Sequence, residues 1–310
     1  MDISIVVPSY NEDESLPHLA EWIDRVMKEH GFSYEVIIVD DGSKDGTWQA
    51  AEKLHAANPC YRGIKFRRNY GKSAALNTGF AAAQGDVVIT MDADLQDSPD
   101  EVPELYRMIK EDGYDLVSGW KKKRYDSKLA KNIPSKFFNW TTRRMSGIHL
   151  HDFNCGLKAY RHDVVKSIEV YGEMHRFIPV IAKWAGFGKI GEKVVQHRKR
   201  EFGVTKFGMS RFINGYLDLM SIMFMSKFGK QPMHFFGAVG TISGLFGLVS
   251  LIVVLILRMT GSISLTHSVW FYLSMLFLVL GVMLFLAGFI GELVCRNSTT
   301  RNQYLIEKEL

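Results

Sequence analysis

The sequence predicts an α/β fold, a mostly parallel sheet with helices on both faces, followed by two C-terminal transmembrane helices. Short apolar runs alternate with amphipathic segments over the first 120 residues, polar motifs follow these runs, and two long apolar runs lie near the end. Strands that alternate with helices are typical of parallel sheets. Such sheets bind ligands at the carboxyl ends of their strands, so we expect the polar motifs to meet there.

Each element can be placed from its pattern. The apolar runs predict buried strands at 3–7, 35–39, 64–66, 86–91 and 116–118. The amphipathic segments between them predict helices near 14–30, 45–57, 72–84 and 99–111.

The bulk composition excludes several classes of protein. The mean hydropathy of −0.03 averages a soluble region up to about residue 230 and an apolar region after it. The three cysteines are far apart and form no CxxC pair, which argues against a disulfide framework and a thiolate zinc site. The chain begins directly with a strand pattern, so we expect no cleavable signal peptide.

Two uncharged runs, 233–257 and 269–291, are long enough to cross a membrane, since about 20 apolar residues suffice. Gly240 and Gly244 form a small-xxx-small pair in the first run, which permits close packing either between the two helices or between subunits. Basic residues flank the pair of runs on both sides, which predicts that both ends are cytoplasmic.

The charges are unevenly placed. Residues 193–232 carry eight Lys or Arg against two acidic residues, and residues 121–144 carry nine against one. A basic segment before a membrane span suits an anionic leaflet, and nothing in the chain resembles a nucleic-acid-binding module. We therefore expect a cytoplasmic catalytic domain (1–206), an amphipathic or simply connecting segment (207–232), the two spans (233–257 and 269–291) and a cytoplasmic tail (292–310).

The first polar motif argues against one class of enzyme, and the second allows a contact with a nucleotide. VVPSYNEDE (6–14) stands where a dinucleotide-binding fold would carry GxGxxG, and this absence argues against a dehydrogenase. VDDGSKDGT (39–47) places Asp40 and Asp41 at a strand end, where a carboxylate can accept hydrogen bonds from a base or a ribose. The same residues also suit a turn, with Asp45 capping the next helix.

RNYGKSAALNTG (68–79) ends like a phosphate-binding P-loop, but Phe66 occupies the position that requires its first glycine. The P-loop is therefore rejected. A helix that begins near Lys72 still predicts backbone N–H groups close to a phosphate.

DVVITMDADLQDSPDE (86–101) gives the sharpest signal. In an extended chain Asp92 and Asp94 point the same way, and two such carboxylates favour Mg²⁺ or Mn²⁺, with Gln96 adding a carbonyl oxygen. A surface turn is the alternative. The residues Ser98, Pro99 and Glu101 then predict an N-cap, a first-turn proline and a capping-box acid.

In this order and spacing, the motifs VVPSYNE, VDDGS, NYGKSAALNTG and MDADLQ resemble those of the family 2 glycosyltransferases with a GT-A fold, over roughly residues 1–230. With the two C-terminal spans, the chain is similar to the polyprenyl-phosphate members of that family, the bactoprenol glucosyltransferases and dolichol-phosphate mannose synthases. HRKREFGVTKFG (197–208) and DFNCGLKAY (152–160) resemble the family's basic and acceptor-side segments.

The resemblance implies roles for individual residues. The nucleotide would contact Pro8, Tyr10, Glu12, Asp40, Lys72 and Asp92, and the metal would contact Asp92, Asp94 and Gln96. The acceptor phosphate would contact Arg124, Arg198, Arg200 and Lys206. The catalytic candidates are Asp94, Asp152 and Arg200, with Asp152 either orienting the acceptor or acting as a base.

The implied reaction moves a hexose-type sugar, preferably from a UDP-sugar, to a polyprenyl phosphate with inversion at the sugar carbon. The resemblance also implies a bacterial inner-membrane protein and a homo-oligomer, with a tetramer as one option. A processive polysaccharide synthase is disfavoured because the chain has no QxxRW motif. A transferase with a different lipid acceptor, or an inactive membrane scaffold, is the alternative.

Overall fold

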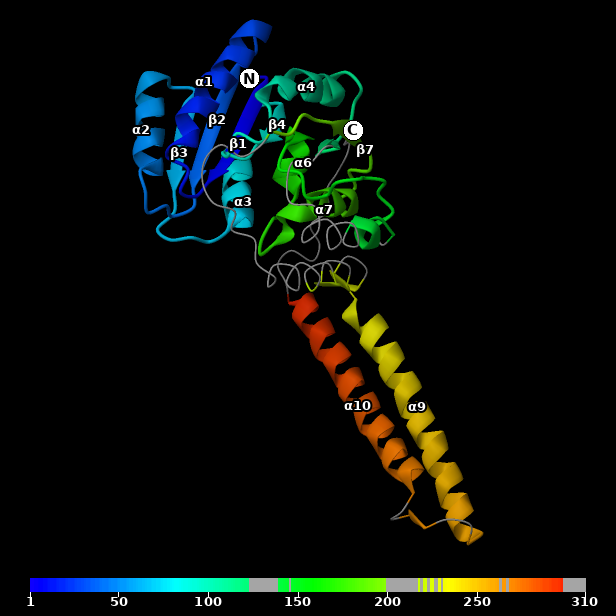
Figure 1. Cartoon of the computed structure of the whole chain (residues 1–310). Coiled ribbons are helices and arrows are strands. Elements are labelled where there is room, and N and C mark those ends of the chain that lie inside the picture. The colour runs from blue at the N-terminus through cyan, green and yellow to red at the C-terminus, as the bar shows by residue number, and fades with distance from the viewer. Residues whose placement is uncertain are drawn as a thin grey trace. The chain divides into compact units, whose positions relative to one another are not determined.

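The computed structural model describes residues 1–122, 139–144, 146–198, 231–261 and 268–297, with the short pieces 217, 220–221, 224–225, 228–229 and 264–265. The chain divides into two compact units, Met1–Met220 and Ser221–Leu310, which are described separately (Figure 1).

The first unit contains a seven-stranded sheet in the order β3-β2-β1-β4-β6-β5-β7. Neighbouring strands are parallel except at β6, which runs antiparallel to both β4 and β5. The predicted mostly parallel sheet is therefore confirmed. The strands are β1 (Ile3–Ser9), β2 (Tyr34–Asp40), β3 (Tyr61–Lys65), β4 (Val87–Thr90), β5 (Leu116–Trp120), β6 (Lys158–Arg161) and β7 (Ile190–Val194).

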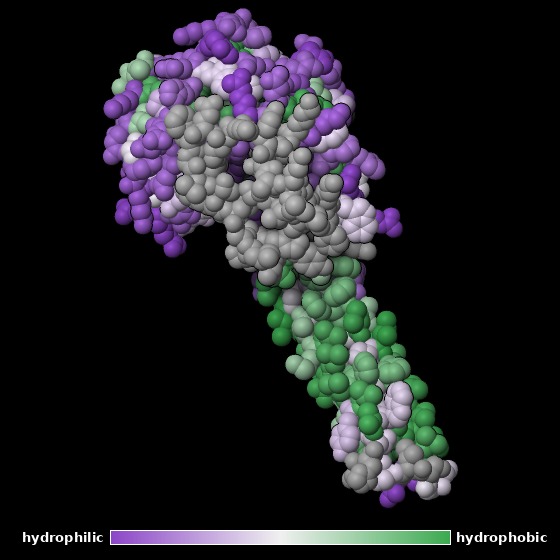
Figure 2. Space-filling view, in the orientation of Figure 1, coloured by the Kyte–Doolittle hydropathy of each residue, from purple (hydrophilic) through white to green (hydrophobic). Residues whose placement is uncertain are grey.

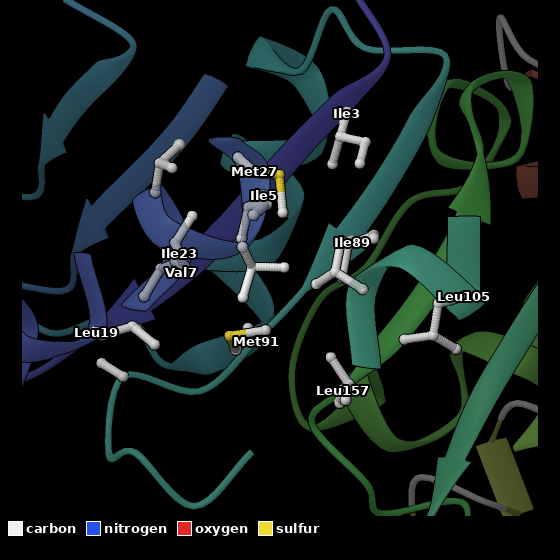
Figure 3. Close-up of a cluster of buried hydrophobic side chains, with 14 of the residues drawn as sticks. Ile3, Ile5, Val7, Leu19, Ile23, Met27, Ile89, Met91, Leu105 and Leu157 are labelled. Atoms are coloured by element: carbon white, nitrogen blue, oxygen red, sulfur yellow. The ribbon is translucent and has the colours of Figure 1, made fainter. Parts of the chain in front are cut away.

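Helices follow most of the strands: α1 (Ser15–His30), α2 (Thr47–Ala57), α3 (Lys72–Ala82), η1 (Pro99–Glu101), α4 (Val102–Lys110), α6 (His162–Ser167), η2 (Met174–Arg176) and α7 (Ile178–Trp184). They cover both faces because successive side chains of β1 point to opposite sides. On one face Ile5 and Val7 pack with Ile23 of α1 in the main core (Figure 3). On the other face Val6 meets Gly79 of α3 so closely that an added Cβ would lie 2.3 Å from its side chain.

The structure corrects several sequence predictions. The strands β6 and β7 were not predicted, since neither shows the apolar run of a central parallel strand. Residues 93–94 form a turn beyond the end of β4, so the argument from an extended chain does not hold for Asp92 and Asp94. The helix predicted at 99–111 is divided into η1 and α4.

The predicted capping box is wrong. Pro99 does open η1, but the Ser98 hydroxyl accepts no N–H from the helix; it donates to Asp100 at 3.0 Å. Glu101 instead accepts the N–H of Gln196 at 3.0 Å and pairs with Lys193. A long-range contact with β7 thus replaces the local cap.

The second unit is a helical hairpin of α9 (Pro232–Met259) and α10 (Val269–Arg296). By length and composition both helices could span a membrane, and their surface is largely hydrophobic (Figure 2). An added Cβ on Gly240 would lie 2.7 Å from the carbonyl oxygen of Gly281, and Ser274 donates to Ser250 at 2.7 Å. The glycines therefore serve close pairing of the two helices. The predicted segment 207–232 and the tail 292–310 lie mostly outside the described residues.

Candidate active site

The site begins where the loops after β1 and β2 hold each other. Asn11 accepts the N–H of Lys44 at 3.0 Å and its own N–H donates to Ser43 at 2.9 Å. Asn11 has a φ of 55°, a left-handed conformation that is uncommon outside glycine and gathers at functional sites. These contacts fix Pro8, the last residue but one of β1, and the predicted nucleotide residues Tyr10 and Glu12 beside the VDDGS turn.

Asp40 and Asp41 have different tasks. Asp41 accepts the N–H groups of Tyr70 and Gly71 at 2.7 and 2.9 Å, and so ties the VDDGS turn to the loop before α3. Burial raises the pKa of Asp41 above its usual value, although these two hydrogen bonds oppose the shift. Asp40 is fully buried; its Oδ1 accepts the N–H of Ser43 at 2.8 Å, while its Oδ2 has no hydrogen-bond partner within the described part of the chain. A buried acceptor without a partner is costly, and a ligand donor would remove that cost.

The predicted helix start at Lys72 is confirmed, because α3 begins there. The ammonium group of Lys72 is hydrogen-bonded to the carboxylate of Asp92. Burial would raise the pKa of Asp92, but Lys72 and Lys121 outweigh it and hold the pKa of this carboxyl at about 2. Asp92 is therefore an anion over the whole physiological range, already facing a cation.

Asp94 and Gln96 lie on the turn after Asp92. Asp94 is buried and accepts the N–H of Gln96 at 3.2 Å, across Leu95, whose φ is 60°. Among the described residues no three His, Cys, Asp or Glu side chains surround a point that could hold a metal. The oxygen donors of Asp92 and Asp94 suit Mg²⁺ or Mn²⁺ nevertheless, since these ions take substrate phosphates and water as further ligands.

A buried ion pair involves Asp97, which follows the turn that carries Asp94 and Gln96. Lys121, the first lysine after β5, is 2.7 Å from Asp97, and their side chains are 13% and 0% exposed. Asp97 also forms an isolated antiparallel bridge with His197, and Arg198 donates its N–H to the carbonyl of Gln96 at 3.0 Å. The acidic turn is thereby joined to the start of the basic segment.

The side chain of Arg198 contacts an aromatic ring. Its guanidinium lies 4.1 Å from the centre of the Trp22 ring of α1, and Trp22 itself donates to Asp100 at 3.0 Å. This arrangement is a cation–π contact. The predicted role of Arg198 as a ligand of the acceptor phosphate thus stays a prediction. The other predicted phosphate ligands, Arg124, Arg200 and Lys206, lie outside the described residues.

Asp152 stands on the loop before β6 and is buried. Its carboxylate accepts the N–H of Asn154 at 3.0 Å. Its main chain is held on both sides: the carbonyl accepts from Ser118 at 3.3 Å and the N–H donates to Glu192 at 3.1 Å. The sequence indicated Asp152 but gave no sign of Glu192, which is 40 residues away.

Two further residues near the site were missed by the sequence analysis. Gly156 packs against Asp92 so closely that an added Cβ would lie 2.5 Å from Oδ2 of the carboxylate. His175 of η2 lies 3.1 Å from Ser73 through its Nδ1, and its N–H also donates to the Ser73 hydroxyl. Burial, together with Lys72 and Arg176, holds the pKa of His175 well below its usual value. Its ring is therefore neutral at physiological pH.

The sheet carries a cluster of polar side chains at the carboxyl ends of its strands, where α/β sheets bind their ligands. The chain matches glycosyl transferase family 2 over residues 4–169. It belongs to this family and is a glycosyltransferase, as the sequence predicted.

The chain is also similar to two curated relatives and to one solved structure. The chain is 39% identical to a dodecaprenyl-phosphate galacturonate synthase of Rhizobium johnstonii, over 77% of this chain and 72% of the relative. It is 33% identical to an undecaprenyl-phosphate 4-deoxy-4-formamido-L-arabinose transferase of Aeromonas hydrophila, over 99% and 93%. Glucosyl-3-phosphoglycerate synthase of Mycobacterium tuberculosis, solved with Mn²⁺, UDP-glucose and glycerol 3-phosphate, is 19% identical with a TM-score of 0.54, over 73% of this chain and 79% of that one. This likeness confirms the GT-A-like fold.

Proposed function

We propose that the protein transfers a hexose-type sugar from a UDP-sugar to a polyprenyl phosphate, by metal-assisted displacement with inversion, and so makes a polyprenyl-phosphate-linked sugar. The observation that carries the proposal is the buried Oδ2 of Asp40, which has no partner in the described chain, on the sheet edge that also holds the Lys72–Asp92 pair. The acceptor class rests on the relatives, which are named for dodecaprenyl and undecaprenyl phosphate.

The donor half of the site suits a nucleoside diphosphate. Asp40 would accept a hydrogen bond from the base, and the N-terminus of α3 would present backbone N–H groups to the diphosphate. Asp92 and Asp94, with Gln96, would hold Mg²⁺ or Mn²⁺, which stabilises the departing diphosphate as a Lewis acid when bound. Lys72, already on Asp92, would face the same phosphates.

The acceptor needs no strong base. A phosphate monoester has a second pKa near ~6, so the attacking oxygen is already anionic at neutral pH. That oxygen forms a bond to the sugar C1 as the bond from C1 to the β-phosphate breaks. A donor of charge −2 and an acceptor of charge −2 then give UDP of charge −3 and a phosphodiester of charge −1, with no proton transferred. The protein's task is to bring two anions together, which positioning and cations accomplish.

The rest of the proposal concerns location. The hairpin of α9 and α10 would anchor the enzyme in a bacterial inner membrane, with the catalytic unit and both ends in the cytoplasm, where the basic segments face anionic lipid. A homo-oligomer, with a tetramer as one option, follows from the family resemblance alone.

A transfer assay tests the proposal. The full chain in detergent would be given Mn²⁺ or Mg²⁺, undecaprenyl phosphate and a set of labelled donors that includes UDP-glucose and UDP-galacturonate. Asp94→Ala would serve as the inactive variant and Asp163→Ala, at an exposed aspartate of α6, as the matched control. A labelled lipid made by the wild type and by Asp163→Ala, and lost in Asp94→Ala, is the expected result.

Two other outcomes would overturn parts of the proposal. Metal-dependent UDP binding without a product from any donor would point to a different lipid acceptor. No nucleotide binding at all would point to an inactive membrane scaffold.

A further inference from the structure

Glu192 of β7 is bonded to His151 and to Asp152, the first residue of the acceptor-side motif. Its Oε1 accepts the N–H of His151 at 2.7 Å and the N–H of Asp152 at 3.1 Å. Its Oε2 lies 2.7 Å from Nδ1 of His151. The side chain is 11% exposed. A single, largely covered carboxylate thus receives three donors from two consecutive residues.

The register of the sheet explains why Glu192 reaches them. Glu192 on β7 is the direct partner of Ser118 on β5. Residues paired across parallel strands point to the same face, and both side chains contact Asp152. Ser118 donates to the carbonyl of Asp152 at 3.3 Å while Glu192 accepts its N–H. The peptide groups on both sides of Asp152 are therefore fixed to the sheet, which sets the point from which its carboxylate projects.

His151 provides a second point of attachment. Its ring stacks on Trp120, the last residue of β5, with a centroid distance of 4.0 Å and an interplanar angle of 11°. Its carbonyl accepts from Asn139 at 3.0 Å. Because Oε2 of Glu192 is an acceptor, it selects the form of the ring that carries a proton on Nδ1.

We propose that Glu192 is a positioning residue that acts through Asp152 and sets its place relative to the acceptor phosphate. The proposal rests on the proposed function, in which Asp152 faces the acceptor. Hydrogen bonds from N–H groups to a carboxylate are about twice as strong as those between neutral groups. Their loss would let Asp152 shift, and a displacement of about 1 Å can reduce a rate on the order of 100-fold.

The rival explanation is that Glu192 only stabilises the fold. Glu35 offers the matched control, because its buried carboxylate also accepts a backbone N–H, from Gln84 at 2.8 Å, and pairs with Arg62 at 2.6 Å. Glu35 pairs with Ser4 near the amino end of β1, away from the strand ends that carry the site. Glu35→Gln should lower the melting temperature and leave the kinetic constants unchanged.

The experiment compares Glu192→Ala, Glu192→Gln, Asp152→Asn and the double variant Glu192→Ala/Asp152→Asn in full-length enzyme. Transfer to undecaprenyl phosphate and the Kd for UDP with Mn²⁺ would both be measured. We expect Glu192→Ala to reduce kcat for transfer on the order of 100-fold with the UDP Kd unchanged. Glu192→Gln keeps an oxygen for both N–H groups and should recover most of the rate. The double variant should be no slower than Asp152→Asn alone.

If the fold-losses in kcat of the two single variants multiplied in the double variant, the inference would be overturned, since Glu192 would then act independently of Asp152. Weaker UDP binding in Glu192→Ala, together with a lower melting temperature, would assign Glu192 a structural role only. A wild-type enzyme that makes no labelled lipid would instead defeat the proposed function itself, so the two failures are distinguishable.

Discussion

The two halves of the sheet hold their functional side chains by different means. In the half formed by β3, β2, β1 and β4, Asp40 and Asp41 accept backbone N–H groups from their own turn or the next loop, Asp40 from Ser43 and Asp41 from Gly71. In the half formed by β6, β5 and β7, the main chain of Asp152 is held by side chains far from it in sequence, Ser118 of β5 and Glu192 of β7. Lys121, which follows β5, pairs across the halves with Asp97 in the loop after β4.

Under the proposed function, this difference gives the two halves separate tasks. The first half is assembled from contiguous motifs and presents anions around the N-terminus of α3, which suits a metal-bound diphosphate. The second half depends on strand register and supplies Asp152. Variants in the first half should therefore change donor binding, and variants in the second half should change transfer at constant donor affinity. Residues that touch across the halves give the sharpest tests.

The largest effect is expected from Asp94→Ala in the first half. Loss of a metal ligand removes several kcal/mol of leaving-group stabilisation, which corresponds to a rate reduction on the order of 10³-fold. Removal of divalent cations with EDTA should have the same effect on the wild type. The measurement is transfer rate together with the UDP Kd with and without Mn²⁺. If the Asp94→Ala variant still bound UDP in a Mn²⁺-dependent manner, Asp94 would not be a ligand of the metal.

Gly156→Ala tests whether the two halves of the sheet are coupled, because Gly156 lies just before β6 but touches Asp92 of the other half. The added Cβ would lie 2.5 Å from the Asp92 Oδ2 and 2.9 Å from Oδ1, so the carboxylate must move. We expect a 10- to 100-fold loss of transfer with weaker metal-dependent UDP binding, and a loss of stability of about 1–3 kcal/mol from overpacking.

The control for this change is Gly188→Ala, at a glycine whose added Cβ would have no neighbour within 4 Å. It should behave as wild type in melting temperature and in UDP titration. If Gly156→Ala instead slowed transfer without changing UDP binding, the two halves would not be coupled at Asp92.

The same division explains what the sequence could predict. The strands and helices through β5, and the start of α3 at Lys72, follow from local periodicity and strand-end motifs, and the structure has them within a few residues. β6 (KAYR) and β7 (IGEKV) have charged residues in place of a continuous apolar run, and their partners are set by tertiary contacts. Asp40, Asp92 and Asp94 could be selected because each lies within a motif. Gly156 lies within the DFNCGLKAY motif, but its contact with Asp92 depends on the fold, as do the contacts of Glu192 and His175, and no local pattern encodes them.

A smaller effect is expected at His175, which belongs to η2 but contacts Ser73 beside Lys72. Asparagine can place an oxygen where Nδ1 stands, whereas glutamine extends beyond it. One hydrogen bond contributes about 0.5–1.5 kcal/mol, so His175→Gln should weaken UDP binding by about fivefold and His175→Asn by less. Titration of UDP with Mn²⁺ measures both. Equal effects of the two variants would mean that the hydrogen bond between Nδ1 of His175 and Ser73 does not contribute to UDP binding.

The pH dependence of stability gives an independent check on His175. The folded pKa is depressed, while the unfolded value is near ~6.5. Below that pH the unfolded state binds a proton that the folded state does not, so stability decreases as the pH falls. The difference in melting temperature between wild type and His175→Asn should therefore shrink or reverse from pH 7.5 to pH 5.5. A constant difference would mean that His175 titrates normally.

The smallest effect concerns Arg198, and it decides between two roles for that residue. If Arg198 anchors its segment on Trp22, both Trp22→Leu and Arg198→Ala remove one exposed cation–π contact of about 0.5–1 kcal/mol, and each should raise the KM for the lipid acceptor only two- to fivefold. If Arg198 binds the acceptor phosphate, Arg198→Ala should be far worse than Trp22→Leu, because a charged hydrogen bond to phosphate is lost as well. The 4.1 Å contact with the Trp22 ring favours the first result. That result would leave Arg200 and Lys206 as the predicted phosphate ligands to test in this segment.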